Sequence, residues 1–355
     1  MRKERLFSLD LLRGLDMFLL TVVEPFVVAL AATVALPDAV LSQFRHSWVG
    51  FSLWDMIMPL FIFMSGAAVP FALEKRMVNG LAGGAYWRHV LIRFVVLWFL
   101  GAVAQGRLMT LDIRMFSPFN NTLQAIAVGY LLAAVVFLIP FRMVRMAIPV
   151  ALAATYAGLL HWFGDYTQAG NFAQRVENAV VPLLTPSGSK ALELADPGYT
   201  WWLTSMMFGA MALCGLEATS ILTSAEDERR RCWKLFAMGV ILETAGWAFK
   251  PWIPVIKPIY TLSFTAQAMG WCCLLLAALF LVTDILRFRR GLAFFTLFGQ
   301  TALLAYMCIE VFGDVFRKFA EITTQGVKSA AAPLAQWFAA SVLLVVVLYF
   351  RRRAR

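Results

Sequence analysis

Charged residues are scarce in this chain, and their scarcity sets its class. Of the 355 residues, 15% are charged and 61% are hydrophobic, and the mean hydropathy is +0.73. A soluble domain carries about 25% charged and about 45–50% apolar residues. The composition therefore predicts an all-α, polytopic integral membrane protein. The net charge of +10 does not indicate a nucleic-acid partner, because no basic-aromatic motif is present and basic residues in membrane proteins usually mark cytoplasmic loops.

Cysteine is also rare, and none of the five cysteines has the spacing of a zinc site or of a disulfide framework. We interpret them as small buried hydrophobic residues and expect no metal site. The apolar stretch that follows the basic N-terminus lacks a small-residue cleavage site. We therefore expect a retained membrane span there and not a signal peptide.

Ten segments are apolar enough and long enough to cross a membrane, which takes about 20 residues. The pattern predicts ten spans, or at most eleven, and the ten lie at about 11–35, 54–73, 90–109, 121–139, 144–163, 199–222, 234–253, 259–283, 292–313 and 332–350. No internal repeat and no low-complexity tract is apparent. Residues 1–355 are therefore interpreted as a single integral membrane domain.

The basic residues orient these spans. If the N-terminus is cytoplasmic, the loops on that side carry about twice as many Lys and Arg residues as the opposite loops, and each carries at least two. This bias predicts that both termini are cytoplasmic. It places the loop at about 36–53 and the long loop 164–198 on the other side. The expected location is a bacterial inner (plasma) membrane.

The first predicted helix contains charged residues. Ser8 is a predicted N-cap, and Asp10 then falls in the first turn, where carboxylates are favoured. Asp10 and Arg13 are three residues apart and can pair, and Glu24 falls near the same helix face. Ionisable residues within a span normally face a protein interior or a water-filled cavity. This stripe either lines a polar cavity or is a structural ion pair that fixes helix packing.

Histidine is rarer still, with three in the chain, and His46 stands in the most informative segment. Imidazole is the side chain best suited to moving a proton near neutral pH. The neighbouring Trp48 and Trp54 predict a packed loop at a membrane boundary. Ser52 and Asp55 fit the Ser-x-x-acid capping pattern. Asp55 therefore caps the following helix or orients the imidazole of His46, and the two roles are compatible.

Three segments of the N-terminal part carry a resemblance: residues 8–14 (SLDLLRG), 46–51 (HSWVGF) and 55–63 (DMIMPLFIF). They are similar to the heparan-alpha-glucosaminide N-acetyltransferase family of transmembrane acyltransferases, and most of all to its bacterial homologues. Shorter matches lie at Asn121-Thr122-Leu123-Gln124 with Tyr130, at Asp196-Pro197-Gly198, at 260–264 and at 299–312. One residue separates His46 from Trp48, where the lysosomal enzyme of the family has two.

The resemblance implies a reaction and a pair of catalytic residues. The family transfers acetyl groups from cytosolic acetyl-CoA to a terminal glucosamine on the far side of the membrane. Its essential histidine corresponds to His46, and the carboxylate that follows corresponds to Asp55. Further substrate or acyl-donor contacts are predicted at Asp10, Arg13, Trp48, Gln124, Lys257, Ser263 and Glu310.

The expected function is therefore acyl transfer through the membrane to an amino sugar or other glycan, with acetyl-CoA as co-substrate. His46 acts either as a general base whose imidazolium Asp55 stabilises or as a transient acyl carrier. Arg13 meets CoA groups or pairs with Asp10, and Gln124 and Glu310 contact substrate or only pack. The expected partners are the bilayer and the two substrates, and a homodimer is left open.

A transporter of a polar or anionic small molecule is the alternative from another class. Intramembrane carboxylates and kinked helices suit a transporter equally well. Two observations weigh against it: no inverted repeat is apparent, and the cluster around His46 is predicted to sit at one membrane boundary and not at mid-membrane.

Overall fold

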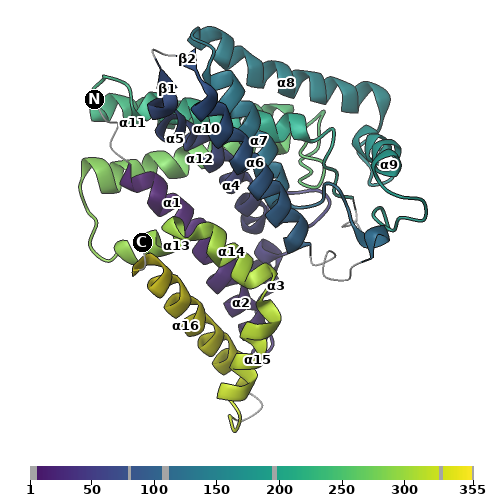
Figure 1. Cartoon of the computed structure of the whole chain (residues 1–355), viewed down its shortest axis with the longest axis vertical. Coiled ribbons are helices and arrows are strands. Elements are labelled where there is room, and N and C mark those ends of the chain that lie inside the picture. The colour runs from purple at the N-terminus through teal and green to yellow at the C-terminus, as the bar shows by residue number, and fades with distance from the viewer. Residues whose placement is uncertain (1–5, 79–80, 106–111, 194–197, 328–330, 354–355) are drawn as a thin grey trace. The chain divides into compact units, whose positions relative to one another are not determined.

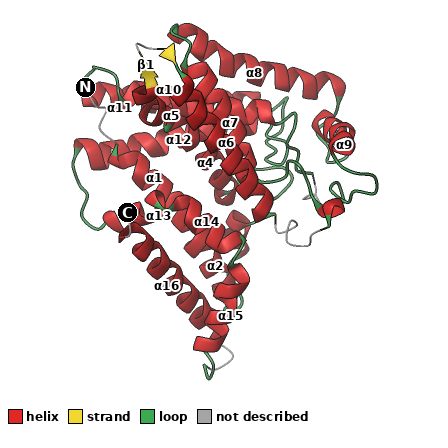
Figure 2. Ribbon diagram, viewed as in Figure 1, coloured by secondary structure: helices red, strands yellow, loops and turns green. Residues whose placement is uncertain are grey.

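The computed structural model describes residues 6–78, 81–105, 112–193, 198–327 and 331–353. These residues form two compact units. The larger unit contains Ser47–Phe51 and Met58–Leu281, and the smaller unit contains Leu6–His46, Ser52–Ile57 and the segment from Val282 onward. Nearly all regular structure is helical (Figures 1 and 2), which confirms the all-α prediction. Among the described residues the only strands are β1 (Met77–Val78) and β2 (Leu81–Ala82), which pair antiparallel.

The smaller unit is built from both ends of the chain. Its N-terminal part is α1 (Phe7–Phe18), a π-helix (Leu19–Val23), α2 (Glu24–Ala31) and α3 (Asp38–Leu41), and its C-terminal part is α13 (Ala293–Gln300), α14 (Ala302–Glu310), α15 (Gly313–Thr323) and α16 (Ala332–Arg353). A Cβ atom on Gly14 would lie 1.9 Å from the Phe295 carbonyl oxygen, and one on Gly299 would lie 2.2 Å from the Asp10 carbonyl oxygen. Only glycine therefore allows α1 and α13 to cross this closely.

The larger unit surrounds one buried helix. Its elements are α4 (Ile57–Ala67), α5 (Val69–Leu73), α6 (Gly84–Ala104), α7 (Thr122–Phe137), α8 (Arg142–Phe163), α9 (Phe172–Leu184), α10 (Ser205–Leu222), α11 (Glu228–Phe249) and α12 (Leu262–Phe280). Nearly every side chain of α10 is buried, since the helix packs against α7, α8, α11 and α12. Glycines again set the closest approaches, because a Cβ on Gly66 would lie 1.8 Å from the Ala212 carbonyl oxygen.

Seven helices are long and apolar enough to cross a membrane, within the part of the chain that the structure describes. They are Phe7–Ala31, Leu53–Arg76, Gly84–Ala104, Arg142–Phe163, Ser205–Leu222, Leu262–Ile285 and Ala332–Arg353. The pair α13 and α14 is apolar enough to add an eighth, but it bends by 70° at Thr301. These helices support a polytopic membrane protein.

The predicted count of ten spans is not confirmed. A helix lies at each of the ten predicted positions, but α7 has only 16 residues. Helix α11 carries the charged run Glu228–Arg231 with Lys234 and is not among the helices apolar enough to cross a membrane. The number of spans and the side on which the termini lie stay predictions. So does the single domain, which the two compact units leave untested.

Ser8 is not the N-cap of the first helix. The helix begins at Phe7, with Leu6 in the N-cap position, and the backbone N–H of Ser8 donates to the Asp284 carboxylate at 3.1 Å. The Ser8 hydroxyl is buried and has no hydrogen-bond partner among the described residues. A carboxylate 276 residues further along the chain therefore accepts a hydrogen bond from the helix start, which sequence spacing alone could not indicate.

Candidate active site

His46 and Asp55 form a hydrogen-bonded pair in the smaller unit. The imidazole Nδ1 lies 2.7 Å from Asp55 Oδ1. The Asp55 side chain is 2% exposed and the His46 side chain is 37% exposed. Since an ionised carboxylate only accepts, the pair places the proton of neutral histidine on Nδ1. Nε2 then has the free lone pair, so it is the nitrogen that can take a proton from a substrate in general-base catalysis.

Asp55 also caps the helix start, so both predicted roles hold in the same carboxylate. Its Oδ2 accepts from the backbone N–H of Ser52 at 2.8 Å and from the Ser52 hydroxyl at 2.8 Å. The backbone N–H of Asp55 in turn donates to the Ser52 carbonyl oxygen at 3.1 Å. One oxygen thus fixes the carboxylate to the chain while the other holds the imidazole.

The two segments that carry the pair are joined at further points. The Leu53 backbone N–H donates to the Gln43 side-chain oxygen at 3.2 Å, and the Phe44 and Trp54 rings lie 5.8 Å apart between centroids. Both segments are short 3₁₀ turns, at Ser42–Phe44 and at Leu53–Met56. These contacts hold His46 against Asp55 by local packing, which is the condition for a fixed proton-transfer geometry.

Three other predicted residues lie in the smaller unit. Asp10 is buried in the first turns of α1, Arg13 is half-buried one turn later, and Glu310 is exposed as the last residue of α14. The carbonyl oxygen of Asp10 lies against Gly299, at the glycine crossing of α1 and α13. Roles for these side chains in binding the acyl donor or the substrate stay predictions.

Asp16 is a residue that sequence reasoning missed. It lies in α1, is 1% exposed, and neither carboxylate oxygen has a hydrogen-bond partner among the described residues. The π-helix Leu19–Val23 begins within one turn of it, and such helices frequently occur at functional sites. The sequence feature that could have pointed to Asp16 is a carboxylate inside an apolar segment, three residues after Arg13.

The remaining predicted residues belong to the larger unit. Trp48 is half-buried there, and its indole N–H donates to the Tyr166 carbonyl oxygen at 3.0 Å. The same ring lies on Gly198, because a Cβ at that glycine would be 2.5 Å from Trp48 Cζ3. Gly198 has φ +80° and therefore also needs glycine for its backbone. Asp196 and Pro197, which complete the predicted turn, lie outside the described residues.

Lys257 is buried beside an aromatic ring. Lys257 is only 5% exposed, and its ammonium lies 5.9 Å from the centroid of the Tyr199 ring. A cation over an aromatic face at that distance is weakly stabilised. Since Tyr199 follows Gly198, the structure brings Lys257 and Trp48 to the same short segment.

The hydroxyl of Ser263 forms a hydrogen bond with a buried loop. Its hydroxyl donates to the Pro254 carbonyl oxygen at 3.0 Å, as the Thr261 hydroxyl does at 2.7 Å. The same loop accepts the backbone N–H of Gly50 on the Val255 carbonyl oxygen at 2.9 Å. Ser263 therefore stabilises the loop that holds the segment after His46, and a contact with substrate stays a prediction.

The side chain of Gln124 also makes its hydrogen bonds within the protein. Its side-chain oxygen accepts from the Asn120 backbone N–H at 2.9 Å and from the Gln105 amide at 3.3 Å, and its own amide donates to Pro118 at 3.1 Å. The residue is fully buried. These bonds close the turn before α7, which favours the packing alternative for Gln124.

Glu177 is a second buried carboxylate that the sequence did not single out. It lies on α9 in the larger unit and is 4% exposed. Its Oε2 accepts from the backbone N–H groups of Trp201 at 3.0 Å and Trp202 at 3.2 Å. Burial raises the pKa of Glu177 to about 7, and the two backbone hydrogen bonds only partly oppose that rise.

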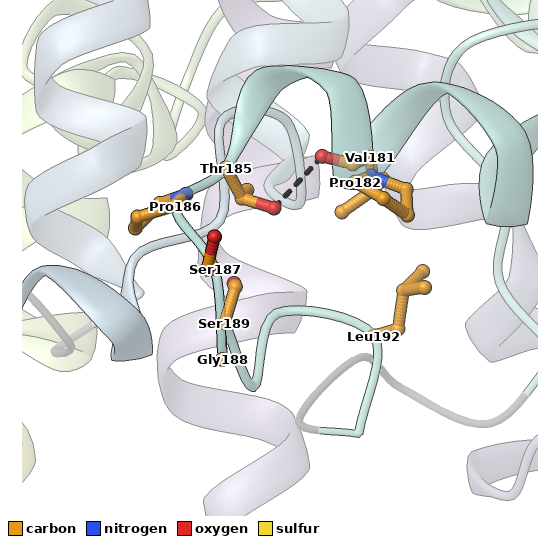
Figure 3. A pocket seen from close by; sticks show the side chains of 8 residues that line it. All are labelled: Val181, Pro182, Thr185, Pro186, Ser187, Gly188, Ser189 and Leu192. Carbon is orange, nitrogen blue, oxygen red and sulfur yellow. Dashed lines mark hydrogen bonds between the residues drawn. The ribbon is translucent and has the colours of Figure 1, made fainter.

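A small pocket lies beside α9. It has a volume of about 220 Å³ and is lined by Val181, Pro182, Thr185, Pro186, Ser187, Gly188, Ser189 and Leu192 (Figure 3). The Thr185 hydroxyl donates to the Val181 carbonyl oxygen at 2.9 Å. The lining contains no titratable side chain, so this pocket offers polar contacts but no acid–base chemistry. Elsewhere among the described residues, no group of three or more His, Cys, Asp or Glu could hold a metal ion.

The fold places the chain in the class of helical proteins that have several helices able to cross a membrane. The chain matches no model of a protein family, and no curated protein is significantly similar to it. A particular function therefore has to be argued from the residues and their geometry.

Proposed function

We propose that the protein is a transmembrane acyltransferase that moves an acetyl group from acetyl-CoA on the cytoplasmic side to an amino sugar or other glycan on the opposite side. The observation that carries this proposal is the His46–Asp55 pair, in which a buried, helix-anchored carboxylate holds an accessible imidazole. The resemblance of the segments around His46 to a family of acetyltransferases supports the same reaction.

The chemistry proposed for the pair is proton transfer during attack on the thioester. The amine or hydroxyl of the acceptor attacks the thioester carbonyl carbon while Nε2 of His46 takes its proton. Asp55 stabilises the imidazolium that forms. Collapse of the tetrahedral intermediate breaks the carbon–sulfur bond, and the imidazolium returns the proton to the CoA thiolate. In the acyl-carrier alternative, Nε2 itself attacks the thioester carbonyl carbon and the CoA thiolate leaves. The acceptor then attacks the acetyl group on His46, the bond from Nε2 to that group breaks, and the proton that the acceptor releases balances the one that the CoA thiolate takes up.

The test uses purified protein, labelled acetyl-CoA and a panel of amino sugars and glycans. The wild-type protein is expected to acetylate at least one acceptor, and His46→Ala is expected to lose the activity. His161→Ala is the matched control, because His161 is an exposed histidine at the end of α8 and should keep wild-type turnover. Label retained on the protein in the absence of acceptor, and lost in His46→Ala, would select the acyl-carrier route.

Sidedness is a separate part of the proposal. CoA is large and polyanionic, so it cannot cross a bilayer, and donor and acceptor are expected to act from opposite sides. Sealed, oriented vesicles with acetyl-CoA on one side and acceptor on the other test this directly. Transfer that needs both substrates in the same compartment would contradict the transmembrane mechanism while leaving the roles of His46 and Asp55 standing.

One observation favours the transporter alternative. The α13–α14 pair is broken by 70°, and the same unit holds the buried carboxylate of Asp16. Broken helices and intramembrane carboxylates are features of transporter binding sites. Uptake of a labelled amino sugar into vesicles without acetyl-CoA, unaffected by His46→Ala, would support transport and contradict acyl transfer.

A further inference from the structure

The smaller unit contains a pocket that the proposed reaction does not use. It has a volume of about 440 Å³ and is lined mainly by residues of α2, α15 and α16. Helix α16 packs against α2 and α15 (Figure 1). Its walls are mostly apolar and include Val28, Phe316, Trp337 and Leu344. Because α2 and α16 belong to candidate membrane spans, the natural occupant of such a pocket is an amphiphile from the bilayer.

Glu24 places a carboxylate in this apolar wall. The residue is half-buried, and no ion pair or hydrogen bond to its side chain is found among the described residues. It lies about 10 Å along the helix from Ala31, where the span ends. A carboxylate at that depth is costly unless a cation or a hydrogen-bond donor compensates it, so the pocket favours a ligand with an ammonium group.

Arg317 supplies a cation to the same pocket. Its guanidinium pairs with Asp314 at 2.9 Å on the exposed side of α15, an exposed pair that contributes little. A guanidinium has five N–H donors, and a phosphate is the anion that they match best after a carboxylate. The pocket thus offers one group for a cation and one for a phosphate.

Trp337, another residue of the pocket wall, is held by two contacts. The Trp337 indole N–H donates to the Val22 carbonyl oxygen at 2.8 Å, and its ring lies 4.7 Å from the Phe26 ring. The first bond ties α16 to the π-helix, where an i+5 register releases carbonyl groups from the usual helical pattern. These two contacts fix the Trp337 side chain in the wall of the pocket.

We infer that this pocket binds a phospholipid whose head group carries a primary ammonium beside its phosphate, as phosphatidylethanolamine does. The ammonium binds Glu24, the phosphate binds Arg317, and the upper parts of the acyl chains lie along the apolar wall and continue into the bilayer. Charge complementarity with both ends of a zwitterionic head group distinguishes this occupant from a neutral or purely anionic lipid.

The experiment compares two lipids that differ only in the amine. Full-length protein in nanodiscs with equal phosphatidylethanolamine and phosphatidylcholine is released into detergent, and the retained lipid is measured by native mass spectrometry. Wild type is expected to retain phosphatidylethanolamine in roughly tenfold excess, about 1.4 kcal/mol. Glu24→Gln should abolish the preference, and Arg317→Gln should lower retention of both lipids equally.

Matched controls come from α15 itself. Glu321→Gln and Lys318→Gln remove the same charges at exposed positions outside the pocket and should leave retention unchanged. Ala340→Phe, which fills the pocket, should lose both lipids, and thermal unfolding checks that each variant is folded. Equal retention of the two lipids by wild type, or a preference that survives in Glu24→Gln, would overturn the inference. So would a dimer mass without lipid, which would assign the pocket to a second copy of the chain.

Discussion

Asp55 and Asp16 are equally buried in the smaller unit, at 1% exposure each, but the fold treats their oxygens differently. Asp55 bonds Ser52 with one oxygen and His46 with the other. Asp16 has no hydrogen-bond partner for either oxygen among the described residues. The comparison separates two uses of a buried carboxylate. The Asp55 carboxylate is fixed by hydrogen bonds and positions His46. The Asp16 carboxylate lowers the stability of the folded protein by about 1–3 kcal/mol or more.

The difference follows from where each residue stands in its helix. Asp55 occupies the first turn of a helical segment, where backbone N–H groups lack helical partners and can bond a carboxylate. Asp16 occupies a helix interior, where every nearby N–H group is already used by the helix. A carboxylate in that place needs a partner from another element, from water or from a ligand.

Among the variants that test this comparison, Asp55→Asn has the largest expected effect. The amide cannot stabilise an imidazolium, so turnover should fall by about 10²–10⁴-fold with little change in KM for acetyl-CoA. Steady-state kinetics on the purified variant measure this. Thermal unfolding supplies the control, because a variant that is unstable but retains turnover per folded molecule would reduce Asp55 to a helix cap.

Glu177 extends the comparison, because backbone N–H groups hold its carboxylate as one holds that of Asp55, but no ion pair with Glu177 is found among the described residues. Its pKa of about 7 in the folded protein exceeds the ordinary glutamate value of about 4.3. The folded state therefore binds the proton more tightly than the unfolded state. The contribution of Glu177 to stability is fully present below about pH 4 and is lost as the pH rises through about 7, and it is at most about 4 kcal/mol.

Unfolding measured between pH 4 and pH 8 tests this sign. Glu177→Gln should remove most of the decrease, since a neutral amide does not titrate. Glu193→Gln changes an exposed glutamate of the same region and should keep the wild-type profile. A profile that rises with pH, or that Glu177→Gln leaves intact, would contradict the assignment.

Asp16→Leu should stabilise the protein by about 1–3 kcal/mol, because it removes a buried carboxylate that has no described partner. The measurement is equilibrium or thermal unfolding in detergent, with acetyl transfer assayed in parallel. A gain in stability with loss of activity would give Asp16 a functional role. A loss of stability would show that Asp16 has a stabilising partner that the described residues do not include.

The smallest expected effect is that of Ser52→Ala. It removes the hydroxyl bond to Asp55 but leaves the backbone bond and the His46 pair, so stability should fall by about 1 kcal/mol. Turnover should stay within a few-fold of wild type. A collapse of activity in this variant would mean that the cap, and not only the carboxylate, sets the geometry of His46.

Much of the candidate site could be predicted from local sequence. Ser52 and Asp55 are three residues apart, a spacing with a known local structure, and the rarity of histidine singled out His46. Gln124 was predicted to contact substrate or only to pack, and Ser263 was predicted to contact substrate. The hydrogen bonds of both side chains lie within loops, and a contact with substrate stays a prediction for each. Whether a polar side chain faces a ligand or a loop depends on which backbone groups the fold leaves unpaired nearby.

The predicted spans show the same limit. A helix lies at each predicted position because a run of apolar residues favours a buried or lipid-facing helix whatever its neighbours are. The number of helices that cross a membrane did not follow from hydropathy. Helix α11 has the length of a span but is not among the helices apolar enough to cross a membrane, and the α13–α14 pair bends by 70° at Thr301. Hydropathy reports average polarity and does not report where a helix breaks.

Composition and short sequence spacings were enough to predict the helical class, the apolar segments and the pairing of His46 with Asp55. Tertiary structure alone decided that Asp284 satisfies the start of α1, that Asp16 is buried without a described partner and that Glu24 and Arg317 line one pocket. Each of these features depends on which residues from distant parts of the chain lie next to one another. Such relations are fixed by how helices pack, and in particular by glycines that let α1 and α13 touch.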